Sequence, residues 1–326
     1  MIRIALLDDY QGAAMKSAPW DNLPDNCVLE VFRDHLKDQD AVALRIKDFE
    51  VVMALRERTP FPRSLLKKLP NLKLLATAGM RNASIDLKAA TELGILVCGT
   101  SSYKSSTVEL AWGLILAVTR NIPREHYGTV AGKWQQTLGV GLEGKTLGIL
   151  GLGHIGGKVA EVARAFRMRI IAWSQNLKEE RASECGAQRV EKEELFKQAD
   201  ILTIHTVLSD RTRGLISHKE LRMMKPTAYL INTSRGPIVD EKALIKALRS
   251  KVIAGAGLDV FDEEPLPKNH ALFGQENVIL TPHLGYVTEE VYRIFYGETL
   301  ENIINFLKGE PQRVLNPEVL QKLRPL

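Results

Sequence analysis

Residues 146–166, TLGILGLGHIGGKVAEVARAF, contain the pattern that decides the fold of the central part of the chain. Gly151, Gly153 and Gly156 form G-x-G-x-x-G between an apolar run of strand type and a helical stretch. In this context the first glycine permits a tight turn, the second lets a pyrophosphate approach the backbone, and the third lets the helix pack closely on the strand. The phosphates then meet N–H groups at a helix N-terminus. The segment predicts a dinucleotide-binding fold, and a tight turn without a ligand is the alternative.

Apolar runs of strand type lie on both sides of this motif. From residue 145 onward, six runs alternate with helical stretches: KTLGILG, RIIAW, DILTIH, AYLINTS, AGLDV and NVILTPH. Six is the number of strands in a dinucleotide-binding sheet. The first hundred residues hold IRIALLD, CVLEVF, FEVVMAL, LKLLATAG and GILVCG, which indicate a second, smaller doubly wound domain. The predicted class is therefore α/β with parallel sheets.

Two apolar helical stretches connect these series. KSSTVELAWGLILAVTRNIPREH, residues 104–126, is expected to form one long helix that is apolar enough on most sides to be buried. TEEVYRIFYGETLENIINFLKGE, residues 288–310, is expected to return to the first domain. We therefore expect residues 1–101 and 290–326 to form one discontinuous domain. Residues 102–289 are expected to form the dinucleotide-binding domain inserted in it.

Composition limits the classes of partner and the compartment. The chain has 326 residues, 45% hydrophobic and 25% charged, as expected for a globular protein with two domains. The net charge of +5 is spread along the chain, so nucleic acid is not an expected partner, and no apolar stretch is long enough to span a membrane. Cys27, Cys98 and Cys185 lie far apart, which indicates neither a metal site nor a disulfide framework. A cytoplasmic location is expected.

The strand IIAW ends at a residue that bears on the cofactor. Folds that bind NAD usually place Asp or Glu there to accept hydrogen bonds from the ribose hydroxyls, whereas this chain has Ser174 followed by Gln175. Without a carboxylate to repel it, a 2′-phosphate is accepted more easily, which favours NADPH. No arginine follows directly, since Lys178 and Arg181 come later, at a helix start. A serine that tolerates either cofactor is the alternative.

Three polar residues follow later strands of the same series: Arg235 in INTSRGPIVD, Glu264 in GLDVFDEEPLP and His283 in ILTPHLGY. In an open α/β sheet the ligand site lies beyond the carboxyl ends of the strands, so the three are expected to meet there. An arginine can hold an anionic group, and a histidine can donate or accept a proton. A glutamate bonded to the imidazole favours the charged ring and fixes its orientation. Taken singly, each residue also has an ordinary structural explanation.

This order of motifs resembles the D-isomer-specific 2-hydroxyacid dehydrogenase family over nearly the whole chain. The resemblance is carried by LKLLATAG, TVELAWGLILAVTR, GLGHIG, HTVLSDRTRGLI, KPTAYLINTSRGPIVDEKAL, GLDVFDEEPLP and TPHLG. It implies a Rossmann domain inserted in a flavodoxin-like substrate domain, and hydride transfer between NAD(P)H and a 2-keto acid. It also implies that Arg235, Glu264 and His283 are the catalytic residues.

The resemblance extends to substrate and assembly. Glyoxylate or hydroxypyruvate reduction is the specific expectation, with a phosphoglycerate dehydrogenase as the alternative within the family. A homodimer formed through the long helix and the arm that reaches Trp134 is implied, and a monomer in which this helix bridges the domains is the alternative.

Further cofactor contacts are expected near the strand ends. They are His154 and Ile155 in the glycine loop, with Thr107, Thr206, Thr233, Ser234 and Asp259. Asp259 is alternatively a group that orients Arg235 or His283, or a strand-end cap. No metal site is expected.

The first domain is expected to supply a substrate loop. In the family, the loop after the LKLLATAG strand presents backbone N–H groups to the substrate carboxylate, and here it reads GMRNASID. Met80, Arg81 and Asn82 stand where small residues are common, which indicates a distinct substrate. Arg56 lies at a comparable strand end and is expected to contact a second acidic group, with a surface role as the alternative. Tyr286, where a small residue is frequent, is expected to narrow the pocket.

Two other functions fit parts of the pattern. Transcriptional corepressors similar to this family use the fold as a dinucleotide sensor, but their partner motifs need a long extension, and none is found up to Leu326. A methyltransferase also uses a glycine loop, but that function leaves the arginine, glutamate and histidine unexplained. An oxidoreductase acting on a small 2-keto acid is therefore the preferred prediction.

Overall fold

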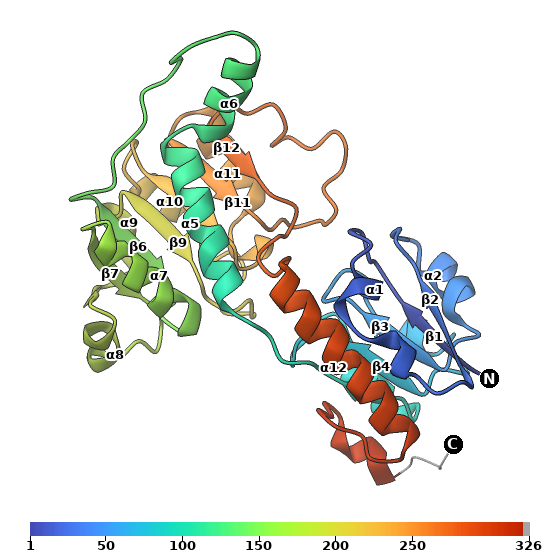
Figure 1. The fold of residues 1–326 in the computed structure, drawn as a ribbon. Helices are drawn as coiled ribbons and strands as arrows, with labels where there is room; N and C mark the ends of the chain where they lie inside the picture. Colours follow the sequence, from blue (N-terminus) through green and yellow to red (C-terminus); the bar gives the residue numbers. More distant parts are fainter. Residues whose placement is uncertain (322–326) are drawn as a thin grey trace. The chain divides into compact units, whose positions relative to one another are not determined.

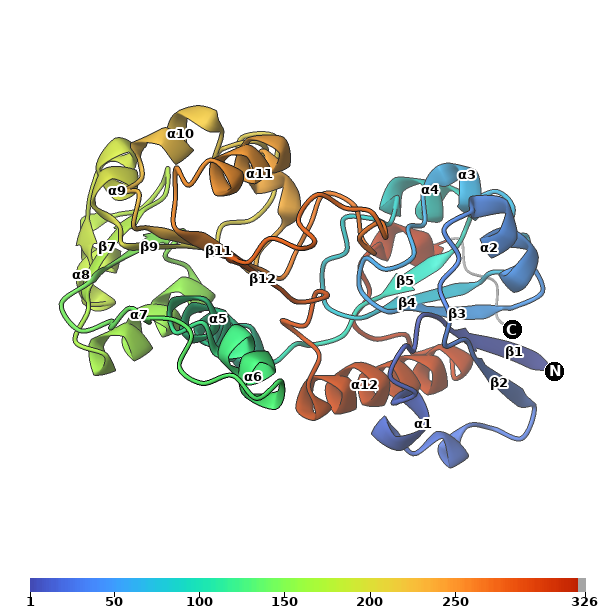
Figure 2. The ribbon, with the colours of Figure 1, turned by 90° about the horizontal axis from the view of Figure 1, so that it is seen from above.

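The computed structural model describes residues 1–321, and its chain divides into two units. One unit consists of Met1–Tyr103 with the segment from Thr288 onward, and the other consists of Lys104–Val287. Each unit is a parallel sheet with helices on both faces (Figures 1 and 2). The predicted α/β class with two doubly wound parallel sheets is confirmed.

The sheet of the first unit has five parallel strands in the order β2-β1-β3-β4-β5, which is the flavodoxin-like order. Helices α2, α3 and α4 cover one face, and α1 and α12 cover the other (Figure 2). The strands are β1 Ile2–Leu6, β2 Cys27–Val31, β3 Val51–Ala54, β4 Leu74–Thr77 and β5 Leu96–Cys98. The helices are α1 Ala14–Ser17, η1 Trp20–Asn22, α2 Gln39–Ile46, α3 Arg63–Leu66, α4 Leu87–Glu92, α12 Glu289–Leu307 and η3 Pro317–Gln321.

The sheet of the second unit has seven parallel strands in the order β12-β11-β10-β9-β6-β7-β8. With β6 counted as the first strand, its first six strands follow the order 3-2-1-4-5-6 of dinucleotide-binding folds. The strands are β6 Thr146–Leu150, β7 Arg169–Trp173, β8 Gln188–Arg189, β9 Ile201–Ile204, β10 Tyr229–Asn232, β11 Gly255–Leu258 and β12 Val278–Leu280. The helices are α5 Ser105–Thr119, α6 Ile122–Val130, α7 His154–Ala165, α8 Glu179–Glu184, α9 Lys192–Gln198, α10 His218–Met223, η2 Gly236–Ile238 and α11 Glu241–Arg249.

Burial on both faces explains why the strands read as continuous apolar runs. Every residue of β3, β4 and β6 is buried, so no polar residue alternates with the apolar ones. In the second unit, Trp112 and Ile115 of α5 pack with Val159 of α7 on one side of the sheet. Phe196 of α9 and Leu244 of α11 pack on the other side. These cores hold the carboxyl ends of the strands, and the loops beyond them, in fixed positions.

The second sheet contains one strand that the sequence did not predict. Strand β8 has two residues, Gln188 and Arg189, and both are exposed. They pair with Ile171 and Ala172 of β7 at the edge of the sheet. No apolar run marks this strand, because a short edge strand buries almost nothing.

The prediction of one long helix over residues 104–126 is wrong, since the chain forms α5 and α6 instead. Asn121 between them adopts a left-handed conformation with φ 52°. Pro123 has no N–H with which to continue the α5 hydrogen-bond pattern to the carbonyl of Thr119. That carbonyl accepts a hydrogen bond from the Val140 N–H instead, at 2.8 Å. The arm after α6 therefore returns to the end of α5.

Helix α12 packs in the first unit. The Asn302 side chain donates a hydrogen bond to the Gly99 carbonyl at 2.8 Å, and the aromatic rings of Phe295 and Tyr296 are fully buried. None of the helices in residues 1–321 combines the length and the apolar character that a membrane crossing requires. Within the same residues, no cluster of three or more His, Cys, Asp or Glu side chains is arranged to hold a metal ion.

Candidate active site

The glycine-rich loop connects β6 to α7 in the second unit. Gly151 has φ +98°, and a Cβ there would lie 2.8 Å from the Thr206 nitrogen. A Cβ on Gly156 would lie 2.2 Å from the Gly151 carbonyl oxygen, so the fold itself requires glycine at both positions. A Cβ on Gly153, by contrast, meets nothing within 4 Å. The second glycine is therefore not needed for packing, and it borders open space at the start of α7.

The first turn of α7 fits an anionic group. The helix has 12 residues, and its N-cap residue Gly153 makes no side-chain cap hydrogen bond. Unpaired N–H groups and the helix dipole attract negative charge at such an N-terminus. His154 is exposed and Ile155 is partly buried in this turn. The loop therefore suits the pyrophosphate of a dinucleotide, in agreement with the glycine spacing.

Three other residues expected to contact the cofactor lie at neighbouring strand ends. Thr206 follows β9, and Thr233 and Ser234 follow β10. The Ser234 hydroxyl donates to the Thr206 carbonyl and joins these two loops. The Thr233 hydroxyl is buried and has no hydrogen-bond partner within residues 1–321. Buried hydroxyls are rarely left without a partner, so this one is suited to a polar atom of a bound cofactor.

Ser174 and Gln175 follow β7 directly, and the chain turns there, with the Leu177 N–H donating to the Ser174 carbonyl at 3.0 Å. This turn brings Arg181 of α8 back to the glycine loop. Its guanidinium lies 3.4 Å from the Leu152 carbonyl oxygen and 3.5 Å from that of Gly153. In the sequence Arg181 lies seven residues after Ser174, and its contact with the glycine loop was not predicted. The turn that shortens this separation in space has no strong signal in the sequence.

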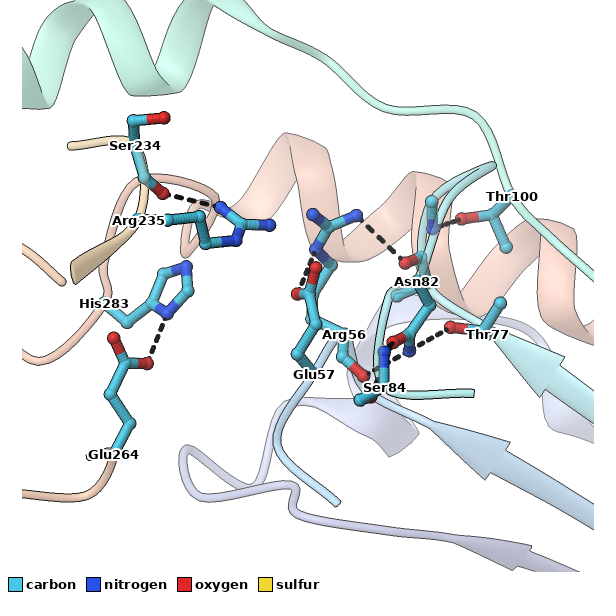
Figure 3. A network of polar contacts seen from close by, with 12 residues as sticks. Arg56, Glu57, Thr77, Asn82, Ser84, Thr100, Ser234, Arg235, Glu264 and His283 are labelled. Carbon is cyan, nitrogen blue, oxygen red and sulfur yellow. Dashed lines mark hydrogen bonds and ion pairs between the residues drawn. The ribbon is translucent and has the colours of Figure 1, made fainter. Parts of the chain in front are cut away.

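The structure brings His283 and Glu264 together. His283 Nδ1 lies 2.6 Å from Glu264 Oε2 (Figure 3). The other carboxylate oxygen of Glu264 accepts a hydrogen bond from the Phe261 N–H at 2.9 Å, which holds the side chain in place. The Tyr286 ring meets the imidazole edge to face, with 5.4 Å between the ring centres. A carboxylate on Nδ1 fixes the ring orientation and leaves Nε2 as the atom that can exchange a proton with a ligand.

Asp259 positions the loop that carries His283. Its buried carboxylate accepts hydrogen bonds from the Thr281 hydroxyl at 2.6 Å, the Leu284 N–H at 2.7 Å and the Gly285 N–H at 2.9 Å. These bonds hold His283 in a left-handed conformation with φ 54°. Burial nevertheless raises the pKa of the Asp259 carboxyl above its ordinary value. Of the roles considered from sequence, the contacts favour orienting His283.

Thr107 serves the same loop. Its hydroxyl donates to the Gly285 carbonyl at 2.9 Å, so this expected cofactor residue is engaged with the chain itself. Arg235 precedes η2, and its guanidinium donates to the Ser234 carbonyl at 2.7 Å. In Figure 3 the Arg235 and His283 side chains extend toward the same side of the strand ends of this unit.

The expected substrate loop of the first unit follows β4. Met80 and Arg81 are exposed, whereas Asn82 is buried. The Asn82 amide donates to the Arg56 carbonyl at 2.7 Å and to the Thr77 hydroxyl at 2.9 Å. No hydrogen-bond partner of the Met80 or Arg81 N–H is found within residues 1–321. The loop therefore offers backbone N–H groups to a ligand, while the Asn82 side chain maintains the loop itself.

Arg56 lies beside this loop, at the end of β3. Its Nη1 is 3.2 Å from the Ala78 carbonyl oxygen, and its Nε is 3.5 Å from the Glu57 carboxylate (Figure 3). The Gly79 N–H donates to the Thr100 hydroxyl at 2.8 Å, which anchors the other side of the loop. Arg56 is one of the residues predicted from the sequence to contact the substrate, whereas no role was predicted for the adjacent Glu57.

Comparison with known proteins agrees with this arrangement. Residues 112–285, just over half of the chain, match the family described as D-isomer specific 2-hydroxyacid dehydrogenase, NAD binding domain. A glyoxylate reductase of Aeropyrum pernix is 43% identical over 272 residues, which cover 80% of this chain and 81% of that protein. A D-3-phosphoglycerate dehydrogenase of Methanocaldococcus jannaschii is 39% identical over 86% of this chain and 55% of that protein.

A solved structure is similar over almost the whole chain. It is that of a phosphoglycerate oxidoreductase from Vibrio cholerae, with a TM-score of 0.90 and 37% identity over 94% of this chain and 99% of that one. The resemblance that the sequence motifs indicated is confirmed. The chain belongs to the D-isomer-specific 2-hydroxyacid dehydrogenases, oxidoreductases that transfer a hydride between a nicotinamide cofactor and a 2-hydroxy or 2-keto acid.

Proposed function

We propose that this protein reduces a short 2-keto acid, glyoxylate or hydroxypyruvate, to the corresponding 2-hydroxy acid. The single observation that carries the proposal is the contact between His283 Nδ1 and Glu264 Oε2 at 2.6 Å, beyond the strand ends of the unit with the glycine loop. In this proposal Lys104–Val287 is the dinucleotide-binding domain, and the unit that begins at Met1 is the substrate domain.

Four side chains take part in the proposed chemistry. The reduced nicotinamide, when bound, supplies a hydride to the keto carbon. Arg235 binds the substrate carboxylate and draws electron density from the carbonyl oxygen, because its planar cation is permanently charged. His283 gives the proton on Nε2 to that oxygen, and Glu264 and Asp259 keep the imidazole in the orientation for this transfer. In the oxidation direction His283 takes the proton back.

Substrate binding in the first unit is proposed to use the loop at residues 79–82. The N–H groups of Met80 and Arg81 donate hydrogen bonds to acceptor atoms of the substrate. Arg56 lies next to this loop. Asn82 acts indirectly, because its amide holds the Arg56 carbonyl.

NADPH is the proposed cofactor. Ser174 and Gln175 place no carboxylate after β7, and Arg181 supplies a cation that contacts the carbonyl of Gly153 at 3.5 Å. A nearby guanidinium attracts a 2′-phosphate. In addition, no carboxylate follows β7 to repel that phosphate. Arg181→Ala is therefore expected to lower kcat/KM for NADPH more than for NADH.

A homodimer and a cytoplasmic location complete the proposal. Helix α6 and the following arm expose Tyr127, Val130, Trp134 and Leu138, with 72%, 75%, 77% and 96% of their surface accessible. Apolar residues gathered on one exposed segment are typical of an association surface. Light scattering on the purified protein measures the number of subunits directly.

The free thiols of Cys27, Cys98 and Cys185 favour a reducing compartment.

The test is a steady-state comparison of NADH and NADPH oxidation with glyoxylate, hydroxypyruvate and pyruvate. We expect the highest kcat/KM with NADPH and one of the first two acids. A preference for NADH would contradict the cofactor assignment and leave the reductase assignment standing. If the protein binds the cofactor but no acid oxidises it, the reductase proposal fails, and a role as a dinucleotide sensor replaces it.

A further inference from the structure

Arg56 is fixed against the proposed substrate loop from both its backbone and its side chain. It has φ +57°, a conformation that non-glycine residues rarely adopt, and the Asn82 amide holds its carbonyl at 2.7 Å. Its Nη1 lies 3.2 Å from the Ala78 carbonyl oxygen. A Cβ added to Gly79 would lie only 2.2 Å from this Nη1 atom. A substituent of a substrate bound at the loop N–H groups is therefore within reach of this guanidinium.

The charge of Arg56 is balanced by the next residue. Glu57 Oε2 lies 3.5 Å from Arg56 Nε, as Figure 3 shows. The pair carries no net charge. A phosphate monoester has a charge of about −2 at neutral pH, so it meets a carboxylate as well as a guanidinium at this position. A hydroxymethyl group or a hydrogen atom meets no such repulsion.

We infer that Glu57 is a specificity-determining residue that excludes 2-keto acids bearing a phosphate monoester and admits those with small uncharged substituents. The inference rests on the proposed reduction of a 2-keto acid and on the proposed place of the substrate at the loop. It separates two substrate classes among the relatives, since these include both glyoxylate reductases and D-3-phosphoglycerate dehydrogenases.

Arg58 and Arg81 also lie near this end of the sheet. Arg58 is engaged elsewhere, since its Nη1 donates to the Asp8 carbonyl at 2.6 Å and its guanidinium lies 4.2 Å from the centre of the Tyr10 ring. Arg81 is exposed on the loop itself. If Arg81 were the residue that governs phosphate, a change at Glu57 would have no effect on substrate preference, so a variant of Arg81 belongs in the test.

The experiment compares kcat/KM for hydroxypyruvate and for its phosphate monoester in the full-length protein. The variants are Glu57→Gln, Arg81→Ala and, as a matched control, Glu30→Gln. Glu30 forms an ion pair of the same length in the same unit, with its Oε2 3.5 Å from Arg3 Nη2, but away from the loop. Inhibition by inorganic phosphate, measured against hydroxypyruvate, gives a second readout that requires no turnover of the ester.

The wild type should prefer hydroxypyruvate. In Glu57→Gln, the ratio of kcat/KM for the ester to that for hydroxypyruvate should rise about tenfold or more, since one full positive charge then faces the phosphate. Phosphate should also inhibit this variant at lower concentration, and Glu30→Gln should behave as the wild type. If Glu57→Gln does not fold, Glu57→Ser is expected to give the same shift.

The inference is overturned by a wild type that prefers the ester, by an unchanged ratio in the Glu57 variants, or by the same shift in Glu30→Gln. A shift found only in Arg81→Ala also overturns it. Failure of the proposed function looks different, because the wild type would then reduce neither acid while still binding the cofactor.

Discussion

The first strand of each sheet leads into a loop and a helix, and the two loops differ in chemistry. In the second unit β6 is followed by three glycines and by α7, a helix of 12 residues. In the first unit β1 is followed by Leu7–Gly12, which contains two buried aspartates, and by α1, a helix of four residues. Both loops include a left-handed residue, Gly151 with φ +98° and Asp8 with φ +60°.

In the first unit, an aspartate side chain accepts hydrogen bonds from the backbone N–H groups at the start of the helix. In the glycine loop, the corresponding N–H groups are proposed to bind a ligand. The Asp9 carboxylate accepts from the N–H groups of Ala13 and Ala14 at 2.9 and 3.1 Å, at the start of α1. The Asp8 carboxylate lies 2.9 Å from His35 Nδ1 and accepts from the Thr59 hydroxyl at 2.7 Å. The first unit therefore holds its own anion where the second is open to a phosphate. Two sheets with similar winding thus differ in ligand because of a few loop side chains, which is why fold alone does not define function.

The largest expected effect compares the two histidine–carboxylate pairs. His283 with Glu264 in the second unit resembles His35 with Asp8 in the first, at 2.6 and 2.9 Å. His283→Asn should lower kcat by about 10²- to 10⁴-fold with little change in cofactor affinity, because it removes the proton donor. His35→Asn should leave kcat near the wild-type value and lower the melting temperature. Equal losses of kcat in both variants would show that the two pairs do not differ in role.

The second prediction concerns stability at acid pH and compares an ion pair of the second unit with one of the first. Burial alone would raise the pKa of Glu220, but Lys192 at 2.8 Å and the Ser217 hydroxyl and N–H lower it to about 2. Because the folded pKa is below the unfolded one, this group stabilises the protein above about pH 4.5, and the stabilisation is lost as the pH falls toward 2. Its size is on the order of 3 kcal/mol.

Glu220→Gln should therefore reduce the free energy of unfolding at pH 7 and make it less dependent on pH below 4.5. Glu92→Gln, which removes an exposed partner of Arg63 in the first unit, is the control and should cost about 0–1 kcal/mol. Urea unfolding at a series of pH values measures both. A pH dependence that persists in Glu220→Gln would assign the acid sensitivity to other groups.

A third, smaller effect compares glycines of the two loops. Gly153→Ala should weaken cofactor binding about tenfold, which corresponds to 1.4 kcal/mol, because the new methyl group enters the space proposed for the pyrophosphate. Its melting temperature should not change, since nothing lies within 4 Å of that methyl position. Gly12→Ala in the first unit, with φ +62°, should show the opposite: normal cofactor affinity and a loss of about 1 kcal/mol in stability. Cofactor titration and thermal unfolding test the pair.

The features that the sequence predicted correctly are those with a local signal. Apolar runs marked both sheets, and the spacing of Gly151, Gly153 and Gly156 marked the turn into α7. The helix break at Asn121 could also have been predicted, because Pro123 cannot continue the preceding helix. The prediction of one long helix followed the apolar pattern instead. Strand β8 had no such signal, because two exposed residues carry no periodicity.

Contacts between distant residues were harder to predict. Arg235, Glu264 and His283 could be placed at the same sheet end from their strands, but the 2.6 Å contact required the geometry of two loops. The return of Arg181 to the glycine loop depends on the turn after Ser174, and the role of Asp259 depends on three donors in residues 281–285. Sequence order identifies which residues approach the site, while hydrogen bonds across loops decide what each one does there.

The last prediction tests the anion of the first unit directly. Asp9→Ala should cost about 1–2 kcal/mol, because it leaves the N–H groups of Ala13 and Ala14 without their acceptor. Asp9→Asn should cost less, since the amide oxygen still accepts one of these bonds. Cofactor affinity should stay unchanged in both variants, as the glycine loop lies in the other unit. Unfolding in urea and cofactor titration together test this. Equal stability of Asp9→Ala and the wild type would mean that the carboxylate does not replace a ligand at α1, and the contrast between the two loops would then rest on the glycines alone.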